Sequence, residues 1–248
     1  MVQETTRDHV YRNWAERLEC DISDMKTPKL IVRQHSGKLE GYHGIYCFYN
    51  GSTCVISAPP KYVPQINIAV SGCRPDEAFD VKLLARSLNS DNYQVIGPAF
   101  QGYVDCGSFI ELKSPEVVEL VTEKSLVLLQ DLRKSCSETE WEHSNIEDHR
   151  QPIIARFYDE KIVAAGSWSV ERSGFLSVGI ISHPDYRGNG HAKAVVSALT
   201  SKGLTTGAIM HYQTLKSNTS SVAIAHSLGY KELACTLAIK FSNLSLLK

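Results

Sequence analysis

The stretch Ser177-Val-Gly-Ile-Ile-Ser-His-Pro-Asp-Tyr-Arg-Gly-Asn-Gly-His-Ala-Lys-Ala-Val-Val-Ser-Ala-Leu199 decides the fold of this chain. It predicts an apolar strand, a turn that contains Gly188 and Gly190, and a helix that begins near His191. Such a turn leaves backbone N–H groups unpaired at the positive end of the helix dipole. Because glycine has no Cβ, the backbone can approach a ligand closely. The pattern therefore indicates a phosphate-binding loop.

Three kinds of phosphate-binding loop compete for this stretch. A Walker-type loop needs Lys and then Ser or Thr after its second glycine, and that order does not occur here. A dinucleotide fingerprint needs a third glycine where this chain has Lys193. The segment Arg187-Gly-Asn-Gly-His-Ala192 instead resembles the acyl-CoA loop of the GCN5-related N-acetyltransferases (the GNAT superfamily), Gln/Arg-x-x-Gly-x-Gly/Ala. A plain strand-to-helix turn with incidental glycines is the alternative.

A second stretch resembles the C-terminal module of the same family. In Asn218-Thr-Ser-Ser-Val-Ala-Ile-Ala-His-Ser-Leu-Gly-Tyr230, an Asn precedes a helix that ends at Gly before an aromatic residue, and a strand over 233–241 follows. Gly229 also suits a helix end on local grounds. The resemblance covers roughly residues 104–248. It implies an α/β (α+β) protein with the GNAT fold, a mixed, mostly antiparallel central sheet flanked by helices.

We therefore predict two domains, a GNAT domain over 104–248 and a smaller N-terminal α/β domain over 1–103. The N-terminal domain carries no motif with an assignable chemistry, and by analogy alone it is a candidate for a degenerate GNAT copy. Its patterns predict a helix over 5–18, a hairpin of strands 45–49 and 53–57 around Asn50-Gly51, a helix over 78–88 and a strand over 93–96.

The remaining patterns predict the elements around the loop. They are a linker over 101–107, a strand over 109–112, a long helix over 115–135, a shorter helix with Trp141, a hairpin of strands 152–158 and 162–170, a strand over 175–182, and a strand over 207–212 that diverges from 177–182.

Composition narrows the class of function. A formal net charge of −1 argues against strong attraction to nucleic acid or an anionic membrane. The first twelve residues contain no apolar run, and no stretch approaches a membrane span. The seven cysteines are dispersed without a zinc-like spacing, which favours reduced thiols in the cytoplasm and no metal. A monomer or a homodimer is expected.

The resemblance implies acetyl-CoA as cofactor. Backbone groups of the strand end are expected to bind the pantetheine arm, the loop to bind the pyrophosphate, and two residues of the second stretch to contact the arm. These cofactor-binding residues are Ile180, Ile181, Ser182, Arg187, Gly188, Asn189, Gly190, His191, Ala192, Lys193, Asn218 and Ser221.

The chain departs from the family at the usual general acid. Many members have Tyr seven residues after the Asn, and this chain has Ala225 there. Tyr212 is the candidate acid, with His211 as the alternative, since alternation turns one of them to the cleft. Glu140 and Glu142 are the candidate bases. The candidates for the acceptor pocket are Trp141, Trp168 and Ser169.

The sequence thus predicts an acetyl-CoA-dependent N-acetyltransferase that acts on a primary amine of a small molecule by direct attack in a ternary complex. The alternatives are an acyltransferase for a longer acyl-CoA or for a protein N-terminus or lysine, and a non-catalytic acyl-CoA-binding regulatory module. The absence of Tyr at position 225 is the feature that supports the non-catalytic alternative.

Overall fold

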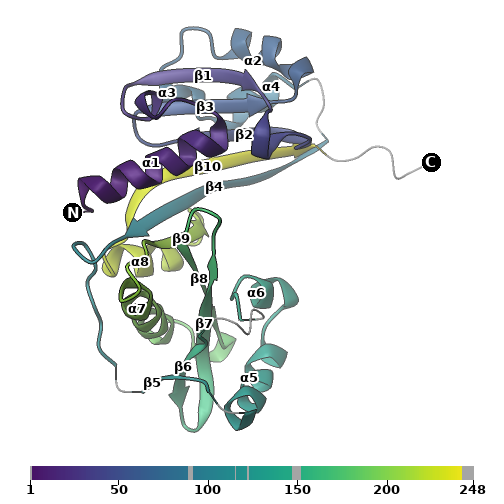
Figure 1. Ribbon diagram of the computed structural model, residues 1–248. Coiled ribbons are helices and arrows are strands. Elements are labelled where there is room, and N and C mark those ends of the chain that lie inside the picture. The colour runs from purple at the N-terminus through teal and green to yellow at the C-terminus, as the bar shows by residue number, and fades with distance from the viewer. Residues whose placement is uncertain (1, 89–91, 115, 122, 147–151, 242–248) are drawn as a thin grey trace. The chain divides into compact units, whose positions relative to one another are not determined.

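The computed structural model describes residues 2–88, 92–114, 116–121, 123–146 and 152–241. The chain divides into two compact units (Figure 1). Unit 1 contains residues 1–3, 102–213 and 220–231, and unit 2 contains residues 4–101, 214–219 and 232–248. Residues 232–241 therefore belong to the same unit as residues 4–101. The domain boundary after residue 103 stays a prediction.

Unit 2 is a sheet covered by helices on both faces. Its strands are β1 (Lys29–Gln34), β2 (Gly44–Tyr49), β3 (Thr53–Ala58) and β10 (Lys231–Phe241), in the order β1-β3-β2-β10. Only β1 and β3 are parallel among these neighbours. The helices are α1 (Glu4–Leu18), α2 (Val63–Ala69), α3 (Pro75–Ala78) and α4 (Val81–Arg86), with short 3₁₀ turns η1 (Ile22–Met25), η2 (Gly37–Leu39) and η3 (Pro60–Tyr62).

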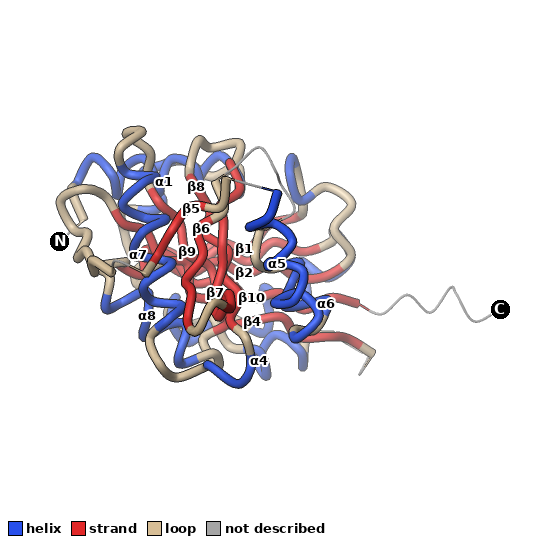
Figure 2. Tube along the Cα trace, turned by 90° about the horizontal axis from the view of Figure 1, so that it is seen from below, coloured by secondary structure: helices blue, strands red, loops and turns tan. Residues whose placement is uncertain are grey.

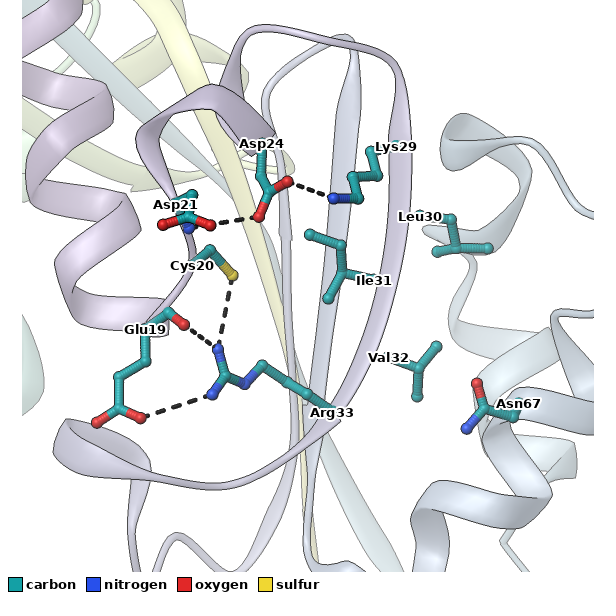
Figure 3. Close-up of a pocket in the computed structure, with 10 residues that line it drawn as sticks. All are labelled: Glu19, Cys20, Asp21, Asp24, Lys29, Leu30, Ile31, Val32, Arg33 and Asn67. Carbon is teal, nitrogen blue, oxygen red and sulfur yellow. Dashed lines mark hydrogen bonds and ion pairs between the residues drawn. The ribbon is translucent and has the colours of Figure 1, made fainter.

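A groove runs along the edge strand β1 (Figure 3). Five consecutive β1 residues line it, together with the end of α1, η1 and Asn67 of α2. Arg33 pairs with Glu19 and Lys29 pairs with Asp24, while Asp21 is a third acid in the lining.

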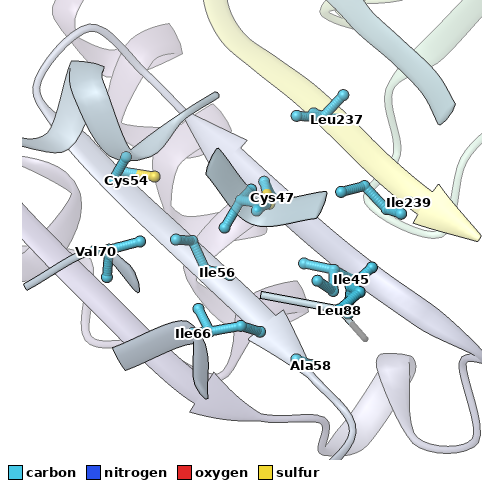
Figure 4. Close-up of a cluster of buried hydrophobic side chains, with 12 residues drawn as sticks. Ile45, Cys47, Cys54, Ile56, Ala58, Ile66, Val70, Leu88, Leu237 and Ile239 are labelled. Atoms are coloured by element: carbon cyan, nitrogen blue, oxygen red, sulfur yellow. The ribbon is translucent and has the colours of Figure 1, made fainter. Parts of the chain in front are cut away.

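The core of unit 2 lies between its sheet and helices α2 to α4. Ile45 and Cys47 of β2 and Ile56 of β3 are fully buried and pack with Ile66 of α2 (Figure 4). Helix α1 packs through Trp14 against Phe48, which neighbours Cys47 and so points to the other face of β2. The almost continuous burial along the hairpin β2–β3 is thus explained by two covered faces.

Unit 1 contains the quoted loop. Its strands are β5 (Val117–Glu119), β6 (Ile154–Tyr158), β7 (Lys161–Val170), β8 (Leu176–Ser182) and β9 (Met210–Leu215), in the order β9-β8-β7-β6-β5. Its helices are α5 (Glu123–Ser135), α6 (Glu138–Glu142), η4 (Pro184–Tyr186), α7 (His191–Leu204) and α8 (Thr219–Ser227). Helices α7 and α8 cover one face of this sheet and α5 and α6 cover the other (Figures 1 and 2).

The predicted fold class is confirmed. Antiparallel pairs join β5 to β6, β6 to β7 and β7 to β8, and β8 pairs with β9 in parallel. The structure is a mixed, mostly antiparallel sheet arrangement flanked by helices. Among the described residues, no helix is both long and apolar enough to cross a membrane.

Two predictions around the middle of the chain are wrong. The strand predicted for 93–96 continues through the Gly97–Pro98 cis peptide as β4 (Tyr93–Val104), which therefore replaces most of the predicted linker. The breakers Gly97 and Pro98 do not end the strand, because Gly97 adopts a φ of +113° within it. Strand β4 carries the chain from unit 2 to unit 1.

Two helix predictions also need correction. The helix predicted for 78–88 is broken, because the Asp80 carboxylate accepts a hydrogen bond from Leu83 N–H and starts a new helix, α4. The helix predicted for 115–135 begins only at Glu123, and β5 precedes it. Residues 109–112 form no strand; there, Ile110 N–H donates to the carbonyl of Leu228.

Candidate functional site

The loop between β8 and α7 exposes backbone donors. Gly188 and Gly190 have φ values of +83° and +81°, and no atom lies within 4 Å of where a Cβ would stand on either. Gly190 is the N-cap of α7, and no side chain caps this helix. The first N–H groups of this 14-residue helix therefore have no side-chain acceptor on the N-cap residue. This geometry suits an anion, as the sequence predicted.

The loop follows a strand whose second half is paired with β7 but lies beyond the end of the ladder with β9. Strand β8 pairs with β7 over its full length, from Leu176 to Ser182. Its parallel ladder with β9 ends at the pair Val178 and Tyr212, although both strands continue. The predicted divergence of the two strands is therefore present, and the interval 179–182 of β8 has no partner in the β9 ladder.

The direction of the backbone groups along β8 shows which N–H and C=O groups face the edge beyond the β9 ladder. The N–H of Leu176 donates to the carbonyl of Ile209, which precedes β9. Because edge groups alternate along a strand, the N–H and C=O of Ile180 face the same side as those of Leu176. Ile180 is half-buried and lies beyond the end of the ladder. An extended chain with amide groups could pair with this edge, as the pantetheine arm would.

Arg187 is fastened by its side chain. Its Nε and one terminal nitrogen donate to the carbonyl of Ser182, each over 3.3 Å, and the same nitrogen lies 2.6 Å from Oε1 of Glu140. The Cys136 thiol also approaches the Ser182 carbonyl, at 3.7 Å. Because the Ser182 carbonyl is engaged, the free groups for a ligand on this strand end are those further into β8.

Besides its contact with Arg187, Glu140 takes part in the N-terminal cap of helix α6. Its Oε2 accepts hydrogen bonds from the backbone N–H and the hydroxyl of Ser137, both at 2.9 Å, in a capping box at the start of α6. These hydrogen bonds, followed by the contact with Arg187, hold the pKa of the Glu140 carboxyl below its usual range. The sequence already carried this signal, since Ser137-x-x-Glu140 is a capping-box pattern.

His191 is the first residue of α7, and its side chain turns inward. Its Nδ1 accepts a hydrogen bond of 2.9 Å from Nε of Arg156 on β6. Burial, followed by the Arg156 cation, lowers the pKa of His191. Arg156 also pairs with Glu116 at 3.1 Å. Sequence reasoning missed Arg156, because a lone arginine in a strand gives no signal of what it will contact.

Tyr212 and Ser221, predicted for different roles, meet in the structure. The Tyr212 hydroxyl lies 2.8 Å from Oγ of Ser221 on α8, and burial raises the pKa of Tyr212. Ser221 and Ala225 are four residues apart and so share one face of α8. The Tyr212 hydroxyl therefore reaches the helix face on which the family's usual acid would stand.

His211, the alternative acid, lies on the other side of β9. Its Nδ1 is 2.5 Å from Oε1 of Glu171, and its ring stacks on Tyr103 at 4.5 Å between centroids. Glu171 lies just after β7, and sequence reasoning did not find it. This buried pair occupies the histidine ring, so Tyr212 is the better-placed of the two candidates.

The residues predicted for the acceptor side are dispersed over two elements. Trp141 of α6 is buried in a core cluster with Leu132 and Ile181, and Glu142 is exposed. Trp168 of β7 is buried, and Ser169 is partly exposed.

Three further predicted cofactor residues lie at or near the starts of helices. Asn218 is exposed directly before α8, and Ala192 and Lys193 lie in the first turn of α7. Asn189 donates from its side chain to the carbonyls of Tyr186 and Arg187, at 3.3 and 3.4 Å, and so braces the loop.

Nowhere among the described residues do three His, Cys, Asp or Glu side chains gather as a metal site would need.

Comparison with known proteins finds one matching family model and several similar solved structures. Residues 131–236 match the family model described as GNAT acetyltransferase. A GNAT-family acetyltransferase from Colwellia psychrerythraea has a TM-score of 0.50 and 15% identity, covering 84% of this chain and 84% of that chain. That likeness must reach into the first 103 residues, since they make up about two-fifths of the chain. No curated protein sequence matches this chain.

Two other solved structures are less similar. A GCN5-related N-acetyltransferase from Kribbella flavida has a TM-score of 0.47 and 14% identity, covering 66% of this chain and 65% of that chain. The yncA protein from Salmonella typhimurium, solved with its cofactor acetyl-CoA, has a TM-score of 0.38 and 12% identity, covering 53% of this chain and 96% of that chain.

Proposed function

We propose that this chain, whose residues 131–236 match the GNAT acetyltransferase family model, transfers an acetyl group from acetyl-CoA to a primary amine of a small molecule. The reaction would be a direct attack by the amine in a ternary complex. The observation that carries the proposal is the open edge of β8 at 179–182, followed directly by the uncapped, glycine-bearing start of α7.

The residues present fit acetyl-CoA. The open strand edge suits the amide-bearing pantetheine arm, and the loop N–H groups of 188–192 suit the pyrophosphate. Lys193 would add a positive charge close to the phosphates, and Asn218 and Ser221 would contact the arm. When bound, acetyl-CoA supplies an activated acetyl thioester, and the CoA thiol is released at the end.

Tyr212 is the residue that we assign to hold the proton for the departing sulfur. Like any tyrosine with an ordinary pKa, it carries its proton at neutral pH. Burial raises the pKa further, and Ser221 Oγ lies 2.8 Å from the hydroxyl. A general acid within hydrogen-bond reach contributes 10²- to 10⁴-fold in typical enzymes. Because a thiolate is a good leaving group, we expect the lower part of that range here.

The base would take a proton from the incoming amine. Glu142 is exposed on α6 and is the better candidate, through a bridging water. Glu140 remains the alternative, although its two oxygens are engaged by Ser137 and Arg187. Trp141, Trp168 and Ser169 remain candidates for the acceptor side.

Ala225 favours the second candidate function, a regulatory module that binds acyl-CoA without turnover. Ala225 is fully buried at the position where many family members have the acid. A longer acyl-CoA and a protein N-terminus or lysine as acceptor are further alternatives. A cytoplasmic location and a monomer or homodimer also stay predictions.

Release of free thiol from acetyl-CoA, measured over a panel of amines, tests the function. Thermal shift with CoA should be run in parallel. We expect CoA to raise the melting temperature and at least one amine to give amine-dependent thiol release. Stabilisation by CoA without turnover on any amine would favour the regulatory module, and no stabilisation at all would contradict the site.

A further inference from the structure

The loop's first residue is anchored at several points, and the anchors come from different elements. Arg187 contacts the Ser182 carbonyl at the end of β8 and the Glu140 carboxylate in the first turn of α6. Glu140 is in turn held by Ser137, which precedes α6. The chain therefore links the cofactor loop to α6 through one guanidinium and one carboxylate.

The segment after α6 is also fastened to β8. The side chain of Asn145 donates to the carbonyl of Ser177 over 3.0 Å. The backbone of Ser144 lies so close to Gly179 that a Cβ there would be 2.4 Å from its carbonyl carbon. Helix α6 and residues 143–145 thus contact β8 at Ser177 and Gly179. The ion pair of Glu140 and Arg187 adds a contact at the loop.

An anchor matters there because the two glycines of the loop raise the entropic cost of ordering its backbone. Gly188 and Gly190 permit the positive φ values but lose more backbone entropy on ordering than other residues. If binding had to order the loop, affinity would fall by that cost. An arginine fixed directly before Gly188, with α7 directly after Gly190, leaves only two residues between Arg187 and the N-cap to order.

We propose that Glu140 is a positioning residue, which holds Arg187 on the Ser182 carbonyl and thereby preorganises the loop 187–192 for the pyrophosphate of acetyl-CoA. The inference rests on the proposed function and deepens it. It gives Glu140 a role in cofactor affinity, whereas a base would act in the chemical step. The division of its two oxygens between Ser137 and Arg187 favours positioning, since a base would have to release one of them.

The variants Glu140→Ala and Glu140→Gln separate the two roles. We measure the Kd of CoA by calorimetry, and kcat and KM with acetyl-CoA. The pair is half exposed, so we expect Glu140→Ala to raise the Kd and the KM about fivefold and to keep kcat within about twofold. Glu140→Gln should show a smaller rise, because its amide oxygen still accepts from Arg187. A hundredfold fall in kcat at unchanged Kd would overturn the proposal and make Glu140 a base.

Glu138→Gln is the matched control. Glu138 lies in the same turn of α6 and pairs with Arg133 at 3.2 Å, away from the loop. It loses the same charge at the same helix terminus, so we expect an unchanged Kd for CoA. An equal rise in both variants would mean that the charge of α6 matters and the contact with Arg187 does not, which would overturn the proposal.

A double-mutant cycle with Arg187→Gln checks that Glu140 acts through Arg187. We expect Glu140→Ala to add nothing to the Kd once Arg187 is replaced, whereas fully additive effects would contradict the proposal. Amide exchange in the cofactor-free protein gives an independent measure: residues 188–191 should exchange faster in Glu140→Ala. If the wild type fails to bind CoA, the proposed function fails, while faster exchange would still report the anchor. Circular dichroism should confirm that each variant is folded.

Discussion

The two halves of β8 differ in how their edges are used. The first half, Leu176–Val178, pairs with β7 on one edge and with β9 on the other. The second half, Gly179–Ser182, pairs with β7 alone. A glycine with positive φ lies on each side of the strand in sequence, Gly174 shortly before it and Gly190 in the loop after η4. The candidate site therefore lies at the half of β8 whose second edge has no partner in the β9 ladder, while the other half has both edges paired.

The largest effect should come from a negative charge in the loop. Gly190→Asp places a carboxylate beside the pyrophosphate, and two like charges at about 4 Å repel by about 4 kcal/mol near a protein surface. We expect the Kd of CoA to rise at least about a hundredfold. Gly174→Asp is the matched control, because it has a φ of +83° and equally open surroundings. Equal CoA affinity in the two variants would contradict the loop assignment.

The second-largest effect concerns Tyr212 of β9, which pairs with Val178, the last residue in the first half of β8. We expect Tyr212→Phe to lower kcat about 100-fold with little change in the KM of acetyl-CoA, because the proton donor is lost. Tyr230→Phe is the control, since its ring neighbours Tyr212 but its hydroxyl bonds to Thr200 at 2.7 Å. That variant should lose about 1 kcal/mol of stability and keep its kcat. A Tyr212→Phe enzyme with full kcat would exclude Tyr212 as the acid.

A third substitution tests how tightly residues 143–144 pack against Gly179, in the second half of β8. Gly179→Ala would put a Cβ within 2.4 to 2.6 Å of the backbone of His143 and Ser144. Because backbone cannot move aside cheaply, we expect a loss of about 1 to 3 kcal/mol in the free energy of unfolding. At Gly107 the nearest atom belongs to the flexible Gln3 side chain, at 3.1 Å, so Gly107→Ala should be close to neutral. Urea unfolding measures both, and equal stability would show that the 143–144 segment can shift.

The smallest effect is a pH dependence at the start of α7. Because burial and Arg156 lower the folded-state pKa of His191, the unfolded chain binds more protons at weakly acidic pH. The stability contribution is complete above the unfolded-state value of about 6.5 and is lost as the pH falls through the folded-state pKa. His191→Gln should flatten part of this fall between about pH 7 and 5 in urea unfolding. Identical slopes in the wild type and in His191→Gln would contradict this prediction.

Much of the fold followed from local patterns. The strand before the loop, the helices α7 and α8, the hairpins β2–β3 and β6–β7 and the helix α1 lie where the sequence predicted them, because each has its own period and turn residues. The predictions that depended on breakers were less successful. Gly97 and Pro98 were read as the end of a strand, but they lie inside β4. Local sequence signals where a chain can bend, and packing decides whether it does.

Local sequence was sufficient to predict a phosphate-binding loop and most of the elements around it. These depend on neighbouring residues: glycines that permit positive φ, and a helix that must leave its first N–H groups unpaired. Only the tertiary structure decided that the β9 ladder stops at Tyr212, that Tyr212 meets Ser221, and that Glu140 holds Arg187. Each of these joins residues that are distant in sequence, and such contacts are fixed by how strands and helices pack, which no local pattern encodes.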